Sequence, residues 1–79
     1  MKAKNKKYLD SYKKYLYTAW KHNYSYNFSR AILQEFEKIY TEETGITLKV
    51  NYSCSSCILS LLSKVGKLYF TENPNETVD

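Results

Sequence analysis

The chain has 79 residues, enough for one domain and too few for a second hydrophobic core. A hydrophobic fraction of 43% and a charged fraction of 25% are ordinary for a globular domain and argue against disorder outside the two ends. The net charge of +4 comes from lysines with a single arginine, Arg30, so any nucleic acid would be bound through its backbone rather than read by sequence.

Apolar residues recur at three- and four-residue steps near the N-terminus, which predicts a first helix over residues 6–21. Residues 1–5 before it are expected to form a basic flexible arm. The apolar face of this helix consists of Tyr8, Leu9, Tyr12, Tyr15, Leu16, Ala19 and Trp20.

A second apolar stripe predicts a helix over residues 27–44. Asn27 is a good N-cap for it, and Tyr26 would pack on Ala31 as a hydrophobic staple. Gly45 follows the stripe directly and suits the left-handed position that ends many helices.

Residues 46–50 alternate apolar and polar side chains, which indicates a short extended connector with no partner strand in the chain. Ser53 would then cap a third helix over residues 53–70, which has the widest apolar face. Gly66 inside it indicates either a close helix approach or the end of the helix. Residues 71–79 are expected to form a flexible acidic tail.

These elements predict an all-α fold, a small three-helix bundle in a single domain over residues 6–70. The third helix should be central, with the other two packed over it. The residues expected in the core are Trp20, Phe36, Ile58, Leu61 and Leu62.

The N-terminus is basic but lacks the continuous apolar region of a signal peptide, and no stretch approaches the length of a membrane span. We therefore expect a protein of the reducing cytoplasm that does not enter membranes.

The most specific motif is the C-x-x-C pair of Cys54 and Cys57 at the start of the third helix. In a redox pair, Cys54 would be the attacking thiolate and Cys57 the resolving thiol, although the βαβ unit and cis-proline of thioredoxin-like proteins are missing. In a zinc site, the pair would supply half of the ligands, completed by His22 and a carboxylate or by a second copy of the chain. The pattern favours a third interpretation, in which both cysteines are small buried residues of the core.

No catalytic constellation is visible. The sequence lacks phosphate-binding glycine loops, zinc-protease motifs and EF-hand motifs. His22 has no evident nucleophile or orienting carboxylate beside it, and the glutamates of the second helix form a solvated face. We therefore expect a non-enzymatic protein that needs no cofactor.

Aromatic residues make up 16% of the chain, with nine tyrosines. Tyrosine is enriched at interfaces because it combines apolar area with a polar tip and few rotatable bonds. A core of this size rarely supplies more than about 3–5 kcal/mol, so a partner protein or a second copy would add stability. The unpaired connector is also suited to β-augmentation by a partner. We predict a protein-binding module whose exposed contact residues are Tyr17, Tyr24, Tyr52, Tyr69 and Phe70.

An alternative is sequence-independent binding of nucleic acid, in which tyrosines stack on bases and lysines follow the phosphates. A solubilising lysine face explains the same pattern. The lysines concerned are Lys2, Lys4, Lys6, Lys7, Lys13 and Lys14.

The segment YTEETG at 40–45, followed by SCSSCIL at 53–59, resembles a pattern in short uncharacterised proteins of bacteriophages with AT-rich genomes. In those proteins a helix ending in Thr-Gly precedes a C-x-x-C-[IV]-L helix, and the order of elements matches over residues 8–70. The resemblance implies a viral origin, a host cytoplasm, and a non-enzymatic role as a virion component or a modulator of a host protein.

Overall fold

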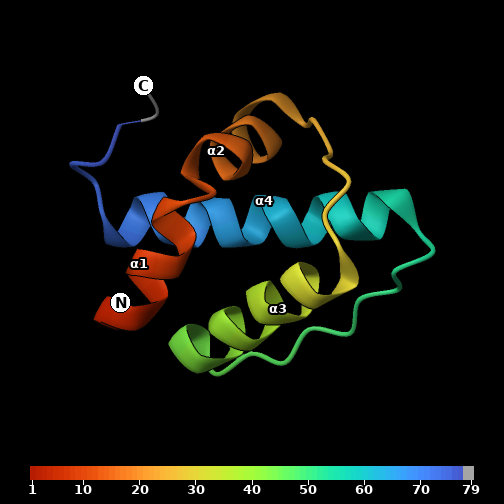
Figure 1. Ribbon diagram of the computed structural model, residues 1–79, viewed down its shortest axis with the longest axis horizontal. Coiled ribbons are helices and arrows are strands. Elements are labelled where there is room, and N and C mark those ends of the chain that lie inside the picture. The colour runs from red at the N-terminus through yellow and green to blue at the C-terminus, as the bar shows by residue number, and fades with distance from the viewer. Residues whose placement is uncertain (78–79) are drawn as a thin grey trace.

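The structure is a computed structural model that describes residues 1–77, and in that range it has four helices and no strand. They are α1 (Ala3–Asp10), α2 (Lys13–His22), α3 (Arg30–Thr44) and α4 (Ser55–Glu72). In Figure 1, α4 runs through the centre, α2 and α3 pack against it from two sides, and α1 lies near its C-terminal end. The all-α class is confirmed, and the predicted third helix, which is α4 in the structure, is central as expected. Over the described range the bundle has four helices rather than three.

The single helix expected over residues 6–21 is wrong, because the chain turns between α1 and α2. The Tyr12 N–H donates to the Leu9 carbonyl at 2.9 Å, and Tyr12 has φ −117° and ψ 7°, outside the helical region. The turn follows Asp10 and Ser11, two residues of low helix propensity. It directs α1 away from the line of α2 and toward the ends of α3 and α4.

The N-terminus docks on the end of α3, and α1 begins three residues before the predicted start. The Asn5 amide, only 4% exposed, donates to Glu43 Oε2 at 2.8 Å, and the Lys2 backbone N–H donates to the same oxygen at 2.9 Å. The Met1 ammonium lies 3.8 Å from the other Glu43 oxygen. Part of the segment expected as a flexible arm, residues 1–5, is therefore a packed helix turn.

The loop before α3 is longer than predicted. The N-cap is Ser29, whose hydroxyl accepts from the Ile32 N–H at 3.4 Å, and not Asn27. Tyr26 forms no staple with Ala31, because its ring packs among other aromatic rings of the loop. Gly45 ends α3 at φ 76°, as the sequence predicts.

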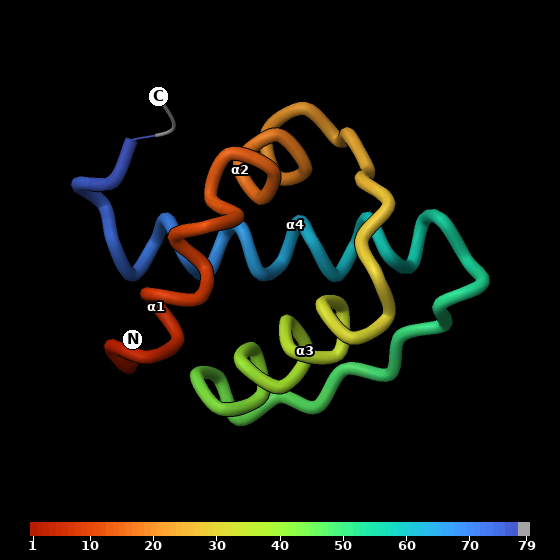
Figure 2. The backbone as a smooth tube through the Cα atoms, viewed as in Figure 1, coloured from red at the N-terminus to blue at the C-terminus, as the bar shows by residue number. Residues whose placement is uncertain are grey.

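After α3 the chain doubles back toward the N-terminal end of α4, as Figure 2 shows. Residues 46–50 form no strand or helix. Asn51 Oδ1 accepts from the Ser53 N–H at 2.9 Å and holds the turn that follows. The N-cap of α4 is Cys54 rather than Ser53, so α4 begins later than expected.

Gly66 marks the close approach of two helices. A Cβ atom at this position would lie 2.5 Å from the Leu16 carbonyl oxygen and 3.2 Å from Trp20 Cβ, both in α2. The two backbones therefore touch, and α4 continues through this glycine to Glu72.

The core lies where α2, α3 and α4 meet, and three of the five predicted core residues are fully buried: Phe36, Leu61 and Leu62. Trp20 is only half-buried; it stacks on Phe70 at the edge of the core, where the ammonium of Lys21 covers its ring. Ile58 is also half-buried, because the first turns of α4 extend past α2 (Figure 1). The remaining buried apolar residues are Leu9, Leu16, Ala19, Leu33, Ile39, Val65 and Tyr69.

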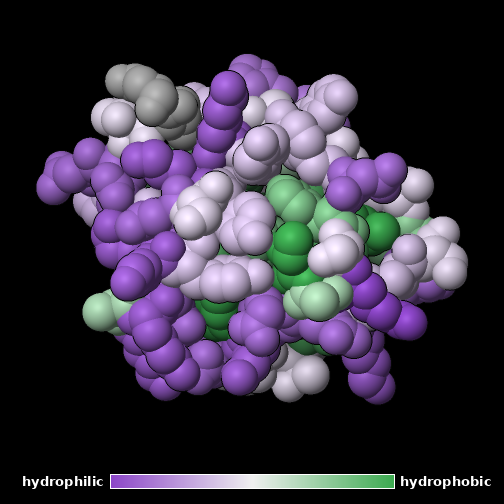
Figure 3. All heavy atoms as spheres, in the orientation of Figure 1, coloured by the Kyte–Doolittle hydropathy of each residue, from purple (hydrophilic) through white to green (hydrophobic). Residues whose placement is uncertain are grey.

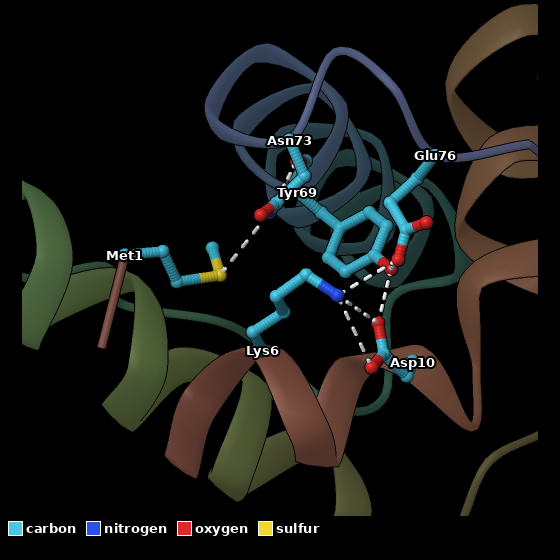
Figure 4. A network of polar contacts seen from close by, with 6 residues as sticks. All are labelled: Met1, Lys6, Asp10, Tyr69, Asn73 and Glu76. Atoms are coloured by element: carbon cyan, nitrogen blue, oxygen red, sulfur yellow. Dashed lines mark hydrogen bonds and ion pairs between the residues drawn. The ribbon is translucent and has the colours of Figure 1, made fainter. Parts of the chain in front are cut away.

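A polar network joins α1, α4 and the segment after α4 (Figure 4). The Lys6 ammonium lies 2.7 Å from Glu76 Oε1 and 3.3 Å from Asp10 Oδ1. The hydroxyl of the buried Tyr69 donates to the Asp10 carboxylate, and this bond, with help from Lys6, lowers the pKa of Asp10. The bond from Lys6 likewise lowers the pKa of Glu76.

The predicted tail therefore starts later and is partly packed. α4 runs two residues past the expected end, and Asn73 caps it by donating its N–H to the Tyr69 carbonyl at 3.0 Å. Glu76 then turns back onto α1. Residues 78–79 of the expected tail lie outside the described residues. No helix within residues 1–77 is both long enough and apolar enough to cross a membrane.

Candidate protein-binding surface

Two tyrosines present large aromatic rings to solvent on one side of α2. Tyr24, in the loop between α2 and α3, is 58% exposed, and Tyr15, in α2, is 41% exposed. Both contact the same ring, that of Tyr26, with centroid distances of 4.8 Å in each case. The two exposed tyrosines therefore belong to one continuous surface.

This surface is anchored in the core by a chain of aromatic contacts. The Phe28 ring lies 5.7 Å from Tyr15 and 5.5 Å from Tyr12, in both cases edge to face. Phe28 in turn meets the fully buried Phe36 at 5.6 Å. Such ring pairs contribute about 0.5–1.5 kcal/mol each beyond their buried area, so the exposed rings are held in place. We call the set Tyr12, Tyr15, Tyr24, Tyr26 and Phe28 the aromatic surface.

Backbone bonds shape the loop that carries most of this surface. Asn23 ends α2 in the left-handed conformation at φ 53°, which asparagine tolerates better than most residues. The next N–H, that of Tyr24, reaches back to the Thr18 carbonyl at 3.5 Å. The chain therefore reverses direction directly after α2 and runs back beside this helix, where residues 26 and 28 contact Tyr15.

The segment of the sequence that contains the residues of the aromatic surface carries only positive charges. From Ser11 to Gln34 the chain contains no aspartate or glutamate. The cationic residues in that stretch are Lys13, Lys14, Lys21 and Arg30. Two of these cations lie over other rings, Lys21 over Trp20 and Arg30 over Tyr52. The positive charge is therefore spread over the chain and is not concentrated on the aromatic surface.

Apolar residues also reach the surface beside this loop. Figure 3 shows hydrophobic residues exposed between α2 and α3, over α4, with hydrophilic residues around them. An apolar centre with a polar rim is the usual anatomy of a protein interface.

Of the predicted contact residues, only Tyr24 belongs to the aromatic surface. Tyr17 and Phe70 pack on each other at 5.5 Å in a second cluster between α2 and α4, and both are half-buried. Tyr52 is half-buried, with the Arg30 guanidinium 4.8 Å above its ring.

The prediction that Tyr69 is an exposed contact residue is wrong, because its side chain is fully buried. Its position in α4 faces α1, where its hydroxyl finds the Asp10 carboxylate. It cannot contact a partner without local unfolding.

Tyr15, Tyr26 and Phe28 were not identified from the sequence. Tyr15 was assigned to the buried face of the first helix, and the turn after Asp10 changes which face is covered. The spacing Tyr24-x-Tyr26-x-Phe28 in a segment without helical periodicity was the available signal, because such a segment puts alternate residues on one side.

The N-terminal lysines proposed for nucleic acid are partly neutralised. Lys2 and Lys4 both lie 3.5 Å from Glu42 Oε2, and Lys6 is bonded to Glu76. The others, which form no ion pair within residues 1–77, are Lys7, Lys13 and Lys14. The six lysines therefore do not form a uniform cationic patch.

The cysteines are not core residues, contrary to the interpretation that the sequence favoured. Both are free, half-buried and outside the buried cluster. Cys54 is the N-cap of α4, and Cys57 lies one turn later at the edge of a surface groove. Helix α4 begins at the cysteines rather than before them, so they lie at its exposed end.

Within residues 1–77 no three histidine, cysteine, aspartate or glutamate side chains are grouped to hold a metal ion. His22, the proposed third zinc ligand, packs on Tyr17 at the end of α2 instead. A zinc site would therefore need a second copy of the chain to complete it.

No known protein family, curated protein or solved structure matches this chain.

Proposed function

We propose that this chain is a small non-enzymatic protein-binding module that acts through the aromatic surface. The observation that carries the proposal is that Tyr15 and Tyr24 are 41% and 58% exposed and yet held by ring contacts that reach the core. Rings that are ordered before binding lose little entropy when a partner covers them, and tyrosine is a frequent hot-spot residue.

The partner should present an apolar or aromatic centre with acidic residues around it. The net charge of +4 would speed association with such a partner. The resemblance to short bacteriophage proteins would make this partner a virion protein or a host protein.

A single-stranded nucleic acid is the second candidate, because exposed tyrosines on a protein of net positive charge also suit base stacking. The ring geometry favours a protein, since Tyr15 and Tyr26 meet at an interplanar angle of 80° and do not offer parallel platforms to successive bases. Binding of an oligonucleotide that weakens steeply with salt, and is lost on mutating Tyr15 and Tyr24, would favour nucleic acid instead.

Site-specific photo-crosslinking tests the proposal. A benzophenone amino acid replaces Tyr24, and the control carries it in place of Lys38, an exposed residue of α3. In lysate of the source cells, we expect one partner protein captured from position 24 and not from position 38, and lost when Tyr15→Ser is added. Equal capture from both positions, or none from position 24, would contradict the proposal.

A further inference from the structure

The two cysteines lie together at the start of α4. Cys54 Sγ accepts a hydrogen bond from the Cys57 N–H at 3.3 Å and lies 3.3 Å from Ser56 Oγ. The Cys54 sulfur therefore lies against the backbone of Cys57, within one helical turn of the second thiol.

Their environments give the two thiols different character. The Cys57 thiol, the Ser56 hydroxyl and backbone N–H groups lower the pKa of Cys54 to about 7. The same contact raises the pKa of Cys57. Near neutral pH Cys54 is thus partly ionised to the nucleophilic thiolate, whereas Cys57 stays protonated.

A groove of about 370 Å³ opens beside Cys57, and its wall includes Ser56, whose hydroxyl lies 3.3 Å from Cys54 Sγ. Cys57 contributes to its wall, and Lys49 and Lys64 supply two positive charges. Hydroxyls come from Thr47 and Ser60, and none of the described lining residues is acidic. The groove is large enough for a small ligand, and its charge favours one that carries carboxylates.

We propose that Cys54 and Cys57 form a thiol–disulfide exchange site for small disulfides that carry carboxylates, such as acidic peptide disulfides. The site is separate from the aromatic surface, so this activity does not depend on the proposed protein-binding function. Because both cysteines lie outside the hydrophobic core, they do not serve as core residues, and thiol–disulfide exchange is a role that their position permits.

The reaction proceeds in two balanced steps. The Cys54 thiolate attacks one sulfur of the substrate disulfide; a bond from Cys54 to that sulfur forms, the substrate S–S bond breaks, and the released thiolate takes a proton from solvent. Cys57 then gives up its proton and attacks Cys54 Sγ, so the Cys54–Cys57 bond forms and the second thiolate leaves with that proton. Two electrons pass from the dithiol to the substrate, which becomes two thiols.

The test uses the full chain in its reduced form, with glutathione disulfide as the anionic probe and cystamine as the cationic probe, followed by mass spectrometry at pH 7. We expect the native chain to lose two hydrogens as the internal disulfide forms. Cys57→Ser should accumulate one glutathionyl group on Cys54. Cys54→Ser should react at least about tenfold more slowly, because Cys57 stays protonated. Serine is a good N-cap, so this variant keeps the fold.

A second pair of variants tests the groove. Replacing Lys49 and Lys64 by glutamine should slow the reaction with glutathione disulfide by about tenfold and should not slow the reaction with cystamine, because repulsion of this cation is removed. Three results would overturn the proposal: equal reactivity of the two single-cysteine variants, a preference for cystamine in the native chain, or a zinc ion held by the thiolates of two copies.

Discussion

Replacing Gly66 by alanine tests the packing that places the aromatic surface. The new Cβ would lie 2.5 Å from the Leu16 carbonyl oxygen and 3.0 Å from its carbon. Ordinary contacts between carbon and oxygen begin near 3.3 Å, so α2 must move away from α4 by about 0.8 Å. The atoms in the way belong to the backbone and cannot rotate aside.

The expected cost follows from two opposing effects. Overpacking of this kind costs about 2–3 kcal/mol, and alanine regains about 1 kcal/mol of helix propensity over glycine. The net loss of about 1–2 kcal/mol should lower the Tm by about 5–15 °C in a domain of this size. Thermal unfolding followed by far-ultraviolet circular dichroism measures it, and the near-ultraviolet signal should weaken because Trp20 lies at the same crossing.

Gly45→Ala is the matched control. Gly45 has φ 76° but open space around its Cβ position, so alanine there costs about 1 kcal/mol from backbone strain without moving a helix. Its near-ultraviolet signal should be unchanged. If Gly66→Ala were as stable as the native chain with an unchanged near-ultraviolet spectrum, the close crossing of α2 and α4 would be wrong.

Further substitutions test the polar contacts. Tyr69→Phe removes the hydroxyl bonded to Asp10 and should cost about 1–2 kcal/mol by urea unfolding; no loss would contradict that bond. The pKa values of Asp10 and Glu43 are lower in the folded protein than in the unfolded chain. Both carboxylates therefore stabilise the fold above a pH of about 4–5, and this stabilisation is lost as the pH falls through their pKa values in the folded protein. The Tm should accordingly hold from neutral pH to about 5 and drop below about 4, less so in Tyr69→Phe. Asn5→Ala, which removes a buried donor to Glu43, should cost about 1–2 kcal/mol, and a neutral result would show that the N-terminus is not docked. Cys54→Ala should lose about 1 kcal/mol as a cap is removed, whereas Cys54→Ser should not; equal stability of the two would refute the capping role.

The sequence predicted the helical class and the three apolar faces, because these depend on local periodicity. It gave the close approach at Gly66 as one of two interpretations, and the structure shows that this one holds. The break between α1 and α2 was missed. Nothing in the apolar spacing interrupts there, and the turn is stabilised by contacts of Asp10 and Lys6 with residues far along the chain. Long-range polar contacts of this kind leave no periodic signal.

The candidate surface was predicted only in part, for a related reason. Tyrosine excess indicated an interface, but which tyrosines are exposed depends on how the helices cover one another. Tyr69 is fully buried with its hydroxyl on Asp10 of α1, whereas Tyr15 is 41% exposed although it shares α2 with the buried Leu16. The cysteines lie at the N-terminal end of α4, where they are half-buried and outside the core, and Cys54 rather than Ser53 is the cap.

The most direct test of the central claim compares the affinity of the captured partner for the native chain and for the Tyr15→Ser, Tyr24→Ser double variant, measured by isothermal titration calorimetry. We expect a loss of at least about thirtyfold in affinity, as is typical of hot-spot tyrosines, with a Tm within a few degrees of the native value. Unchanged affinity in a folded double variant would contradict binding through the aromatic surface.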